Sequence, residues 1–257
     1  MRTLGIDLAA RPPTTACCTV EWQGSRARIA QLTAADATDE ELLGHMVGAQ
    51  RVGIDCPLGW PVEFVRTVAG WTDLGPWEPS TPEQLTLRVT DRLVAARVRR
   101  PLSVSADKIA VVAFRCAALL DRFARVQGAS AVDRSGTTGT VAEVYPAAAL
   151  VRWSWFGADG ESPPAHRASY RRGKGRRARE ELVAALAGRL PWLDLAGHGE
   201  DLVRSDDAFD ALVAALVARA VALGLTEGPE TGEQLAAARR EGWIHVPSAG
   251  CLDELVG

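Results

Sequence analysis

Two short stretches decide the fold of this 257-residue chain and read almost alike: Leu4-Gly5-Ile6-Asp7 and Val52-Gly53-Ile54-Asp55. Side chains alternate along a strand, so each glycine shares one face with the aspartate that follows it. A capping box over residues 38–41 starts a helix between the two stretches, and such a crossover delivers a strand parallel to one already present. If the two strands are neighbours, Asp7 and Asp55 emerge side by side at their carboxyl ends, a usual site position in α/β sheets.

The remaining pattern predicts a mixed α/β protein. We expect a five-stranded sheet, with strands over residues 4–9, 14–22, 27–32, 51–56 and 141–145. Helices are expected over residues 39–49, from Pro82 onward, and over 106–127, 179–190, 206–223 and 232–240. The whole chain, 1–257, is expected to form a single domain, with a helical and loop insertion at about 57–104 and a basic segment at about 165–179.

Composition excludes several classes of protein. The 29 Lys and Arg residues are outnumbered by 32 Asp and Glu, for a formal net charge of −3, so any affinity for nucleic acid must come from a local basic stripe. The longest apolar stretches, residues 109–114 and 211–218, are far shorter than the roughly 20 residues of a membrane span. No secretion signal precedes the first strand, and five cysteines without a Cys-x-x-Cys pair indicate reduced thiols. We therefore expect a cytoplasmic protein that does not enter the membrane.

Further acidic residues are expected near the same edge of the sheet. Glu143 lies in the fifth expected strand. The longest helix opens with Ser205-Asp206-Asp207-Ala208-Phe209-Asp210, where either Asp206 or Asp207 shares a helix face with Asp210. Negative charge at a helix start also stabilises the helix dipole, which is the alternative explanation for these aspartates.

Carboxylates that meet in this way need a cation. Two unit charges about 4 Å apart repel by roughly 4 kcal/mol at an effective dielectric of about 20. No Arg or Lys in these motifs is placed to neutralise the acids, and an all-oxygen set of ligands favours Mg²⁺ or Mn²⁺. Two such ions about 3.5–4 Å apart activate a water and stabilise the leaving oxygen of a phosphodiester. The hypothesis requires Asp7 and Asp55 to face each other and Glu143 to be free of an arginine clamp.

An ordered set of motifs resembles one known family. The motifs are Gly5-Ile6-Asp7-Leu8-Ala9, residues 52–59, Arg88-Val89-Thr90-Asp91, Glu143-Val144-Tyr145-Pro146, Ser169-Tyr170-Arg171, residues 206–211 and residues 241–247. In this order they resemble the predicted-nuclease family catalogued as domain of unknown function 429. The resemblance implies a ribonuclease H-like fold, in which the first strand lies beside the fourth. It also implies Tyr-Lys where this sequence has Tyr-Arg.

The resemblance implies a catalytic role and metal binding for five acids: Asp7, Asp55, Glu143, Asp207 and Asp210. The leading hypothesis is a divalent-metal-dependent nuclease, a phosphodiester hydrolase that acts on DNA or RNA with two Mg²⁺ or Mn²⁺ ions. Asp7 would bridge the ions, Asp55 and Glu143 would complete one ligand shell, and Asp207 or Asp210 would hold the second ion.

Basic residues and a tyrosine are the candidates for substrate contact: Arg88, Lys108, Tyr170, Arg171 and Arg172. Arg171 and Arg172 belong to the basic segment, whose glycines would let the backbone approach a phosphate chain. A solvated loop is the alternative interpretation of that segment. A solvated helix face is the alternative for Arg88 and the arginines that follow it at spacings of three to five.

Two other functions remain open. A phosphotransferase of the actin and sugar-kinase type shares an early Gly-Ile-Asp strand, but its phosphate loops need Gly-rich hairpins and here Arg11-Pro12-Pro13 follows the first strand. A non-catalytic nucleic-acid-binding module would keep the fold without turnover. A thiol nucleophile at Cys56 paired with His245 lacks a third orienting residue, so we expect His245 to be structural, in a C-terminal turn.

Overall fold

The computed structural model describes residues 1–73, 75, 81–105, 109–153, 170–171 and 175–256. Within this part, eight strands form one mixed sheet in the order β6-β3-β2-β1-β4-β5-β8-β7. The strands are β1 (Arg2–Asp7), β2 (Ala16–Gln23), β3 (Arg26–Thr33), β4 (Arg51–Asp55), β5 (Val141–Val144), β6 (Leu193–Asp194), β7 (Thr226–Glu227) and β8 (Ile244–Pro247). The first five, which the sequence predicted, are consecutive in space.

The mixed α/β class is confirmed, but the expected number of five strands is wrong. The additional strands β6, β7 and β8 lie at the two edges of the sheet. Two of them have only two residues, too few to show an alternating pattern. The third, β8, lies where a C-terminal turn was expected. Gly242 shortly before it and Pro247 at its last position made these four residues look like part of a loop.

Ten α-helices are present in the described ranges: α1 (Asp39–Gly48), α2 (Val62–Thr72), α3 (Pro82–Thr86), α4 (Val89–Arg97), α5 (Ala110–Val126), α6 (Pro146–Arg152), α8 (Arg176–Arg189), α9 (Gly199–Arg204), α10 (Asp206–Ala222) and α11 (Gly232–Glu241). Short 3₁₀ turns form η1 (Pro12–Thr14) and η3 (Cys251–Leu255). The predicted capping box of Thr38 and Glu41 starts α1, and Thr81 with Gln84 starts α3. None of the described helices combines the length and apolar composition needed to cross a membrane.

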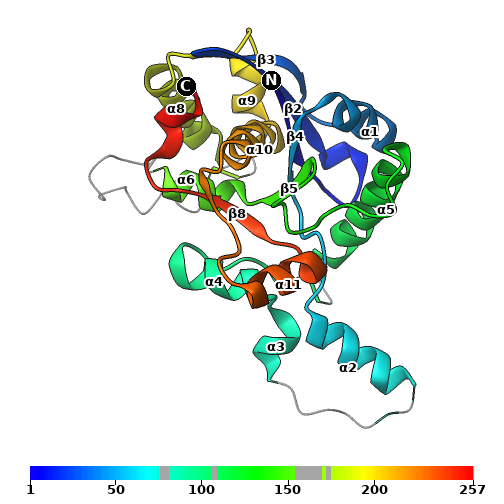
Figure 1. Cartoon of the computed structure of the whole chain (residues 1–257). Coiled ribbons are helices and arrows are strands. Elements are labelled where there is room, and N and C mark those ends of the chain that lie inside the picture. Colours follow the sequence, from blue (N-terminus) through cyan, green and yellow to red (C-terminus); the bar gives the residue numbers. More distant parts are fainter. Residues whose placement is uncertain (74, 76–80, 106–108, 154–169, 172–174, 257) are drawn as a thin grey trace.

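The sheet separates two apolar cores. On one face, α1 and α5 cover the strand residues Leu4, Ile6, Val52 and Ile54. On the other face α10 forms the centre of a larger core, which α6, α8 and α9 complete. Figure 1 shows α10 and α5 on opposite sides of the strands. The alternation predicted for β1 and β4 therefore exists, with Leu and Ile on one face and Gly and Asp on the other.

β1 and β4 pair in parallel, with Gly5 opposite Gly53 and Asp7 opposite Asp55. Both glycines face the backbone of α10. A Cβ atom at Gly5 would lie 2.0 Å from the carbonyl oxygen of Ala211, and one at Gly53 would lie 2.6 Å from that of Ala214. Only glycine permits so close an approach, so these two positions allow α10 to rest directly on the sheet.

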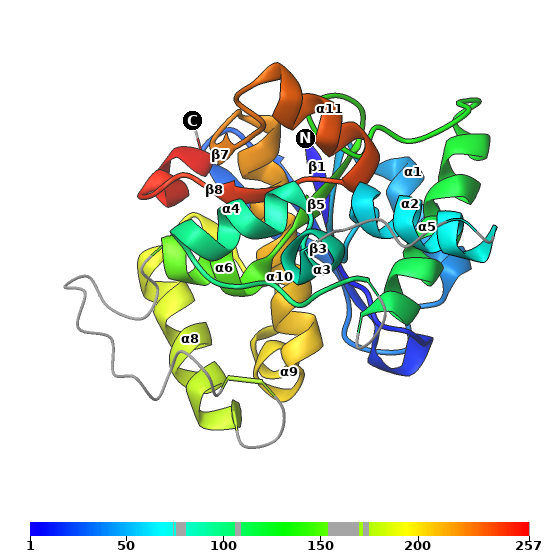
Figure 2. The same cartoon turned by 90° about the horizontal axis from the view of Figure 1, so that it is seen from below.

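The stretch of about 57–104 contributes α2, α3 and α4 to the described structure. Figure 1 places α2 and α3 at the bottom of the molecule, and Figure 2, seen from below, places α4 beside β5 and α6. The same lower end carries α11. These helices surround the carboxyl ends of β1, β4 and β5.

Candidate active site

Three aspartates meet at the lower end of the sheet. Asp7 ends β1, Asp55 ends β4, and Asp210 projects from the start of α10. One carboxylate oxygen of each lies within 4.8 Å of the corresponding oxygens of the other two. Asp210 is buried, whereas Asp7 and Asp55 are partly exposed. Asp7 and Asp55 thus face each other, as the pairing of their strands predicted, and we call the three residues the aspartate cluster.

The other aspartates of α10 are placed differently from Asp210. Asp207, half-buried, shares a side-chain hydrogen bond with Asp7 and therefore borders the aspartate cluster. Asp206 lies 4.0 Å from Arg179 and takes no part in the cluster. Since Ser205 caps α10 through the backbone N–H of Ala208, neither aspartate is needed as the N-cap.

The aspartate cluster is electrostatically unfavourable without a cation. Burial raises the pKa of Asp7 well above its usual value, and repulsion by Asp210 and Asp55 adds to the effect. Burial also raises the pKa of Asp55 to about 7, and that of Asp210 to about 6, although Arg171 opposes both shifts. At neutral pH the cluster therefore holds protons or binds positive charge.

Tyr170 and Arg171 reach the aspartate cluster from the basic segment. The buried Tyr170 hydroxyl donates a hydrogen bond of 2.9 Å to Asp210 Oδ1. Arg171 Nη2 lies 2.7 Å from Asp210 Oδ2 and 3.8 Å from Asp55 Oδ2, and its side chain is 48% exposed. Arg171 is thus a countercharge that solvent still reaches. The sequence excluded a neutralising Arg or Lys only within the acidic motifs, whereas Arg171 belongs to a distant segment that folding brings to the cluster.

Glu143 is held by an arginine rather than by the aspartate cluster. Its two oxygens accept hydrogen bonds from Arg88 Nη1 at 2.8 Å and Nη2 at 2.7 Å, and Oε2 also accepts from the backbone N–H of Leu58. Both side chains are buried. Burial raises the pKa of Glu143 and the guanidinium of Arg88 opposes that shift. The requirement that Glu143 be free of an arginine clamp is not met, so the hypothesis fails in the form drawn from the sequence, with Glu143 as a metal ligand. Only the three aspartates of the cluster remain to support a metal site.

Arg88 has no donor left for a substrate. Besides Glu143, its guanidinium bonds both oxygens of Asp91 and the carbonyl of Glu241, so all five N–H groups are used. The interpretation of Arg88 as part of a solvated helix face is wrong, because it precedes α4 and points into the protein. The spacing of Arg88 and Asp91, three residues apart at a helix start, is the sequence signal that could have indicated this pair.

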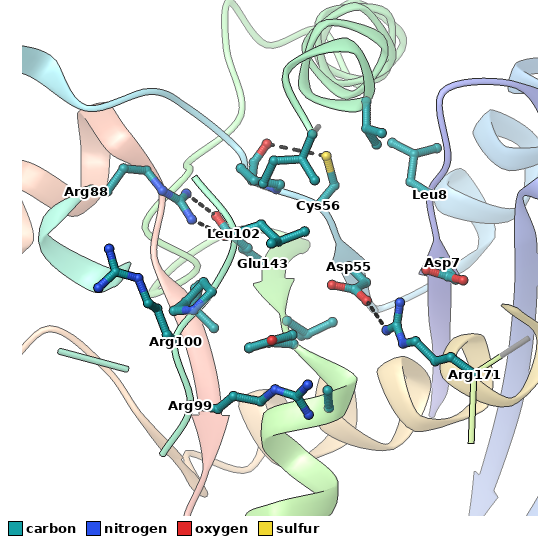
Figure 3. A pocket seen from close by; sticks show the side chains of 18 residues that line it. Asp7, Leu8, Asp55, Cys56, Arg88, Arg99, Arg100, Leu102, Glu143 and Arg171 are labelled. Carbon is teal, nitrogen blue, oxygen red and sulfur yellow. Dashed lines mark hydrogen bonds and ion pairs between the residues drawn. The ribbon is translucent and has the colours of Figure 1, made fainter. Parts of the chain in front are cut away.

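A cavity of about 370 Å³ opens beside the aspartate cluster (Figure 3). Asp7, Asp55 and Arg171 line one side of it, and Arg99 and Arg100 line the other. Apolar side chains complete the wall: Leu8, Cys56, Leu102, Ile109 and Val112. Arg99 and Arg100 belong to the arginines that follow Arg88, for which the sequence offered a solvated helix face, and their place in this cavity was not predicted.

The remaining basic candidates are Lys108 and the other arginines of the basic segment. Lys108 and Arg172, both predicted to contact substrate, lie outside the described residues. Arg176 and Arg177 make ion pairs along α8 with Glu180 and Glu181. Such pairs are typical of a solvated helix face, the alternative that the sequence left open.

Cys56 and His245 do not form a nucleophilic pair. His245 is buried in β8, where Nε2 donates to the carbonyl of Ser135 and Nδ1 contacts the hydroxyl of Thr226 at 2.9 Å. Burial lowers the pKa of His245 to about 4 and raises the pKa of the Cys56 thiol. His245 is therefore structural, as expected, although it lies in a strand and not in a turn.

The fold and the site define a mixed α/β protein with a partly buried carboxylate centre at the ends of two parallel strands. The chain belongs to the family described as protein of unknown function DUF429, whose model matches residues 5–233. The resemblance drawn from the ordered motifs is thereby confirmed at the level of the family. Searches of the curated proteins and of the solved structures each return no match.

Proposed function

We propose that this protein is a divalent-metal-dependent nuclease, a phosphodiester hydrolase that acts on nucleic acid. The observation that carries the proposal is the aspartate cluster, whose three carboxylates come from β1, β4 and α10 and lie within 4.8 Å of one another. Its donor set consists of oxygen only, which suits Mg²⁺ or Mn²⁺. Burial raises the pKa of Asp55 to about 7 and that of Asp210 to about 6, and neighbouring carboxylates add to the shift although Arg171 opposes it, so the charged forms would gain from a further cation.

We also propose that the sheet is ribonuclease H-like. The central strands follow the order β3-β2-β1-β4-β5, with β2 antiparallel to β1 and with β4 and β5 parallel to it. The first strand thus lies beside the fourth, which is the arrangement implied by the family resemblance. In this proposal β6, β7 and β8 are extensions of that sheet at its two edges.

In the proposed centre, Asp7, Asp55 and Asp210 would hold a metal ion, and Asp207 beside them would contribute to a second. Such ions, when bound, activate a water and stabilise the leaving oxygen of a phosphodiester. Tyr170 orients Asp210 through its hydroxyl hydrogen bond. Arg171 neutralises part of the cluster and is exposed enough to contact a phosphate.

Glu143 has a supporting role in this proposal. It accepts from Arg88 and from the backbone of Leu58, and so fastens the segment after β4 to β5. That segment follows directly on Asp55, so the clamp positions one wall of the cavity. The ligand set is therefore smaller than the one implied by the family resemblance.

The test is the substitution Asp7→Asn, which keeps the shape of the side chain and removes its charge. We expect Mg²⁺- or Mn²⁺-dependent cleavage of nucleic acid to fall at least about 100-fold, while the circular dichroism spectrum stays unchanged. Asp253→Asn, on an exposed position of η3, is the matched control and should keep full activity. Equal turnover in the Asp7→Asn variant and the parent protein would refute the assignment. Binding without turnover in any divalent metal would favour a non-catalytic module.

A further inference from the structure

The cavity beside the aspartate cluster has two chemically different walls. Charged residues line two sides of the cavity (Figure 3). Asp7, Asp55 and Arg171 lie on one side, and Arg99 and Arg100 lie on the other. The other wall is apolar. Its members come from four separate parts of the chain, namely the end of β1, the end of β4, the segment after α4 and the start of α5: Leu8, Cys56, Leu102, Ile109 and Val112.

Leu102 is unusual among the apolar residues of this wall. Its exposed fraction is 57%, although it lines a cavity whose other apolar residues, such as Leu8, are buried or partly buried. Figure 3 shows its side chain in the cavity, between Glu143 and Asp55. An exposed leucine in a cavity offers apolar surface that a ligand can cover.

Arg100 provides the positive charge that an anionic ligand would meet. The N–H groups of Arg88 already donate to Glu143 and Asp91, and Arg171 is paired with Asp210. By contrast, Arg100 makes no ion pair or hydrogen bond with any residue that the structure describes, and its side chain is exposed. A guanidinium binds phosphate through two parallel hydrogen bonds, which makes Arg100 a suitable partner for a phosphate group.

The volume restricts what the cavity can hold. About 370 Å³ lies near the lower end of the range of about 300–1,000 Å³ that small-molecule sites occupy. This is room for one nucleotide-sized group. A base that remains paired and stacked in a duplex cannot enter such a cavity, because it would first have to leave the stack at a cost of a few kcal/mol.

We propose that the cavity is a subsite for one unpaired nucleotide of a single-stranded nucleic acid. The base packs against the apolar wall at Leu102, and a phosphate of the strand lies on the side of the cavity that Arg100 lines. This inference rests on the proposed function, because it assigns the substrate of the same centre. It makes single strands, rather than duplexes, the substrate class of this protein.

The experiment measures binding separately from turnover. A fluorescein-labelled single strand of about ten nucleotides, as DNA and as RNA, is titrated with the full-length protein in Ca²⁺, and fluorescence anisotropy is recorded. We expect the single strand to bind at least about tenfold more tightly than the same sequence in a duplex. Arg100→Gln should weaken single-strand binding roughly tenfold, and Leu102→Ala roughly fivefold.

Two matched variants serve as controls. Arg26→Gln removes an exposed arginine at the opposite end of the sheet, and Leu223→Ala removes an exposed leucine that follows α10. Both should bind the single strand as the parent protein does. Equal affinity for duplex and single strand, or an unchanged affinity of Arg100→Gln, would overturn the subsite. A free mononucleotide that binds as tightly as the strand would overturn it too, since the cavity would then serve a small ligand.

The subsite and the proposed function can fail separately. Tight, Arg100-dependent binding of single strands without cleavage in Mg²⁺ or Mn²⁺ would overturn the hydrolase and support the subsite. Cleavage that depends on Asp7 but proceeds equally on single strands and duplexes would support the hydrolase and overturn the subsite.

Discussion

Arg88 and Glu143 show how burial changes the meaning of a charged residue. In the sequence both are candidates for the site, one as a substrate contact and the other as a metal ligand. In the structure their side chains are 1% and 3% exposed and bind each other through two hydrogen bonds. Both oxygens of Glu143 are bound by a guanidinium that is itself buried, whereas Arg171, the arginine that contacts Asp210, is 48% exposed. Metal binding at Glu143 would require breaking a buried ion pair, which is costly.

The prediction at this scale concerns Glu143→Gln. The amide keeps the volume of the carboxylate but cannot balance Arg88, so we expect the free energy of unfolding to fall by about 3 kcal/mol, with Asp91 retaining part of the interaction. Affinity for Mn²⁺, measured by isothermal titration calorimetry, should stay within about twofold of the parent value. The exposed Glu233→Gln in α11 is the control. Lost Mn²⁺ binding with unchanged stability would instead return Glu143 to the set of metal ligands.

At the scale of elements, the site depends on how closely α10 approaches the sheet. Gly5 and Gly53 lie on the same face as Asp7 and Asp55, and both face the α10 backbone. The residues of α10 opposite them are alanines, including Ala211, Ala214 and Ala215. Because only glycines and alanines lie at this contact, the first turns of α10, and with them Asp210, come close to the ends of β1 and β4. The glycines of the repeated Gly-Ile-Asp stretch therefore assemble the cluster whose charge the aspartates provide.

Gly5→Ala tests this dependence. The new methyl group would meet the carbonyl oxygen of Ala211 at 2.0 Å and the amide nitrogen of Ala215 at 2.2 Å, so α10 must move away from β1. We expect a loss of about 3 kcal/mol in unfolding free energy, measured in urea, and weaker Mn²⁺ binding as Asp210 leaves the cluster. Gly44→Ala, inside α1 with open space around it, should instead stabilise the protein by about 0.5–1 kcal/mol. Unimpaired stability and metal binding in Gly5→Ala would contradict the proposed role of this contact.

At the scale of the whole molecule, the aspartate cluster links stability to pH. The folded-state pKa values of Asp55 and Asp210, about 7 and about 6, lie above the ordinary value of 3.8. A raised pKa means that the folded state binds the proton more tightly, so the stabilisation is complete below the ordinary value and disappears as the pH rises through about 6–7. A divalent ion would supply the missing positive charge above that range.

We therefore expect the melting temperature to rise by several degrees with Mn²⁺ at about pH 8 and much less at about pH 5.5, because protons compete with the ion. Differential scanning calorimetry with and without Mn²⁺ measures this difference. His245, whose lowered pKa of about 4 acts in the opposite direction, affects both samples equally and cancels. In the Asp7→Asn variant, Mn²⁺ should no longer raise the melting temperature at about pH 8. An increment that is equal at both pH values would argue against metal binding by the aspartate cluster.

Local patterns alone determined the elements that carry the cluster. The Gly-Ile-Asp repeat, the helix between its two copies and the capping box at Thr38 predicted β1 beside β4, with Asp7 next to Asp55. The start of α10 was likewise predicted at Asp206. These features depend on alternation, capping and crossover connections, which act over a few residues or follow general rules of chain topology.

Tertiary structure alone decided which charges meet. Neither the clamp of Arg88 on Glu143, 55 residues apart, nor the approach of Arg171 to Asp210 has a signal in the spacing of the chain. The cavity that places Arg100 opposite the aspartate cluster is likewise formed by distant segments. Alternation and capping determine on which face of its own element a side chain lies. Which charged groups become partners is determined only when separate elements pack together and exclude water between them.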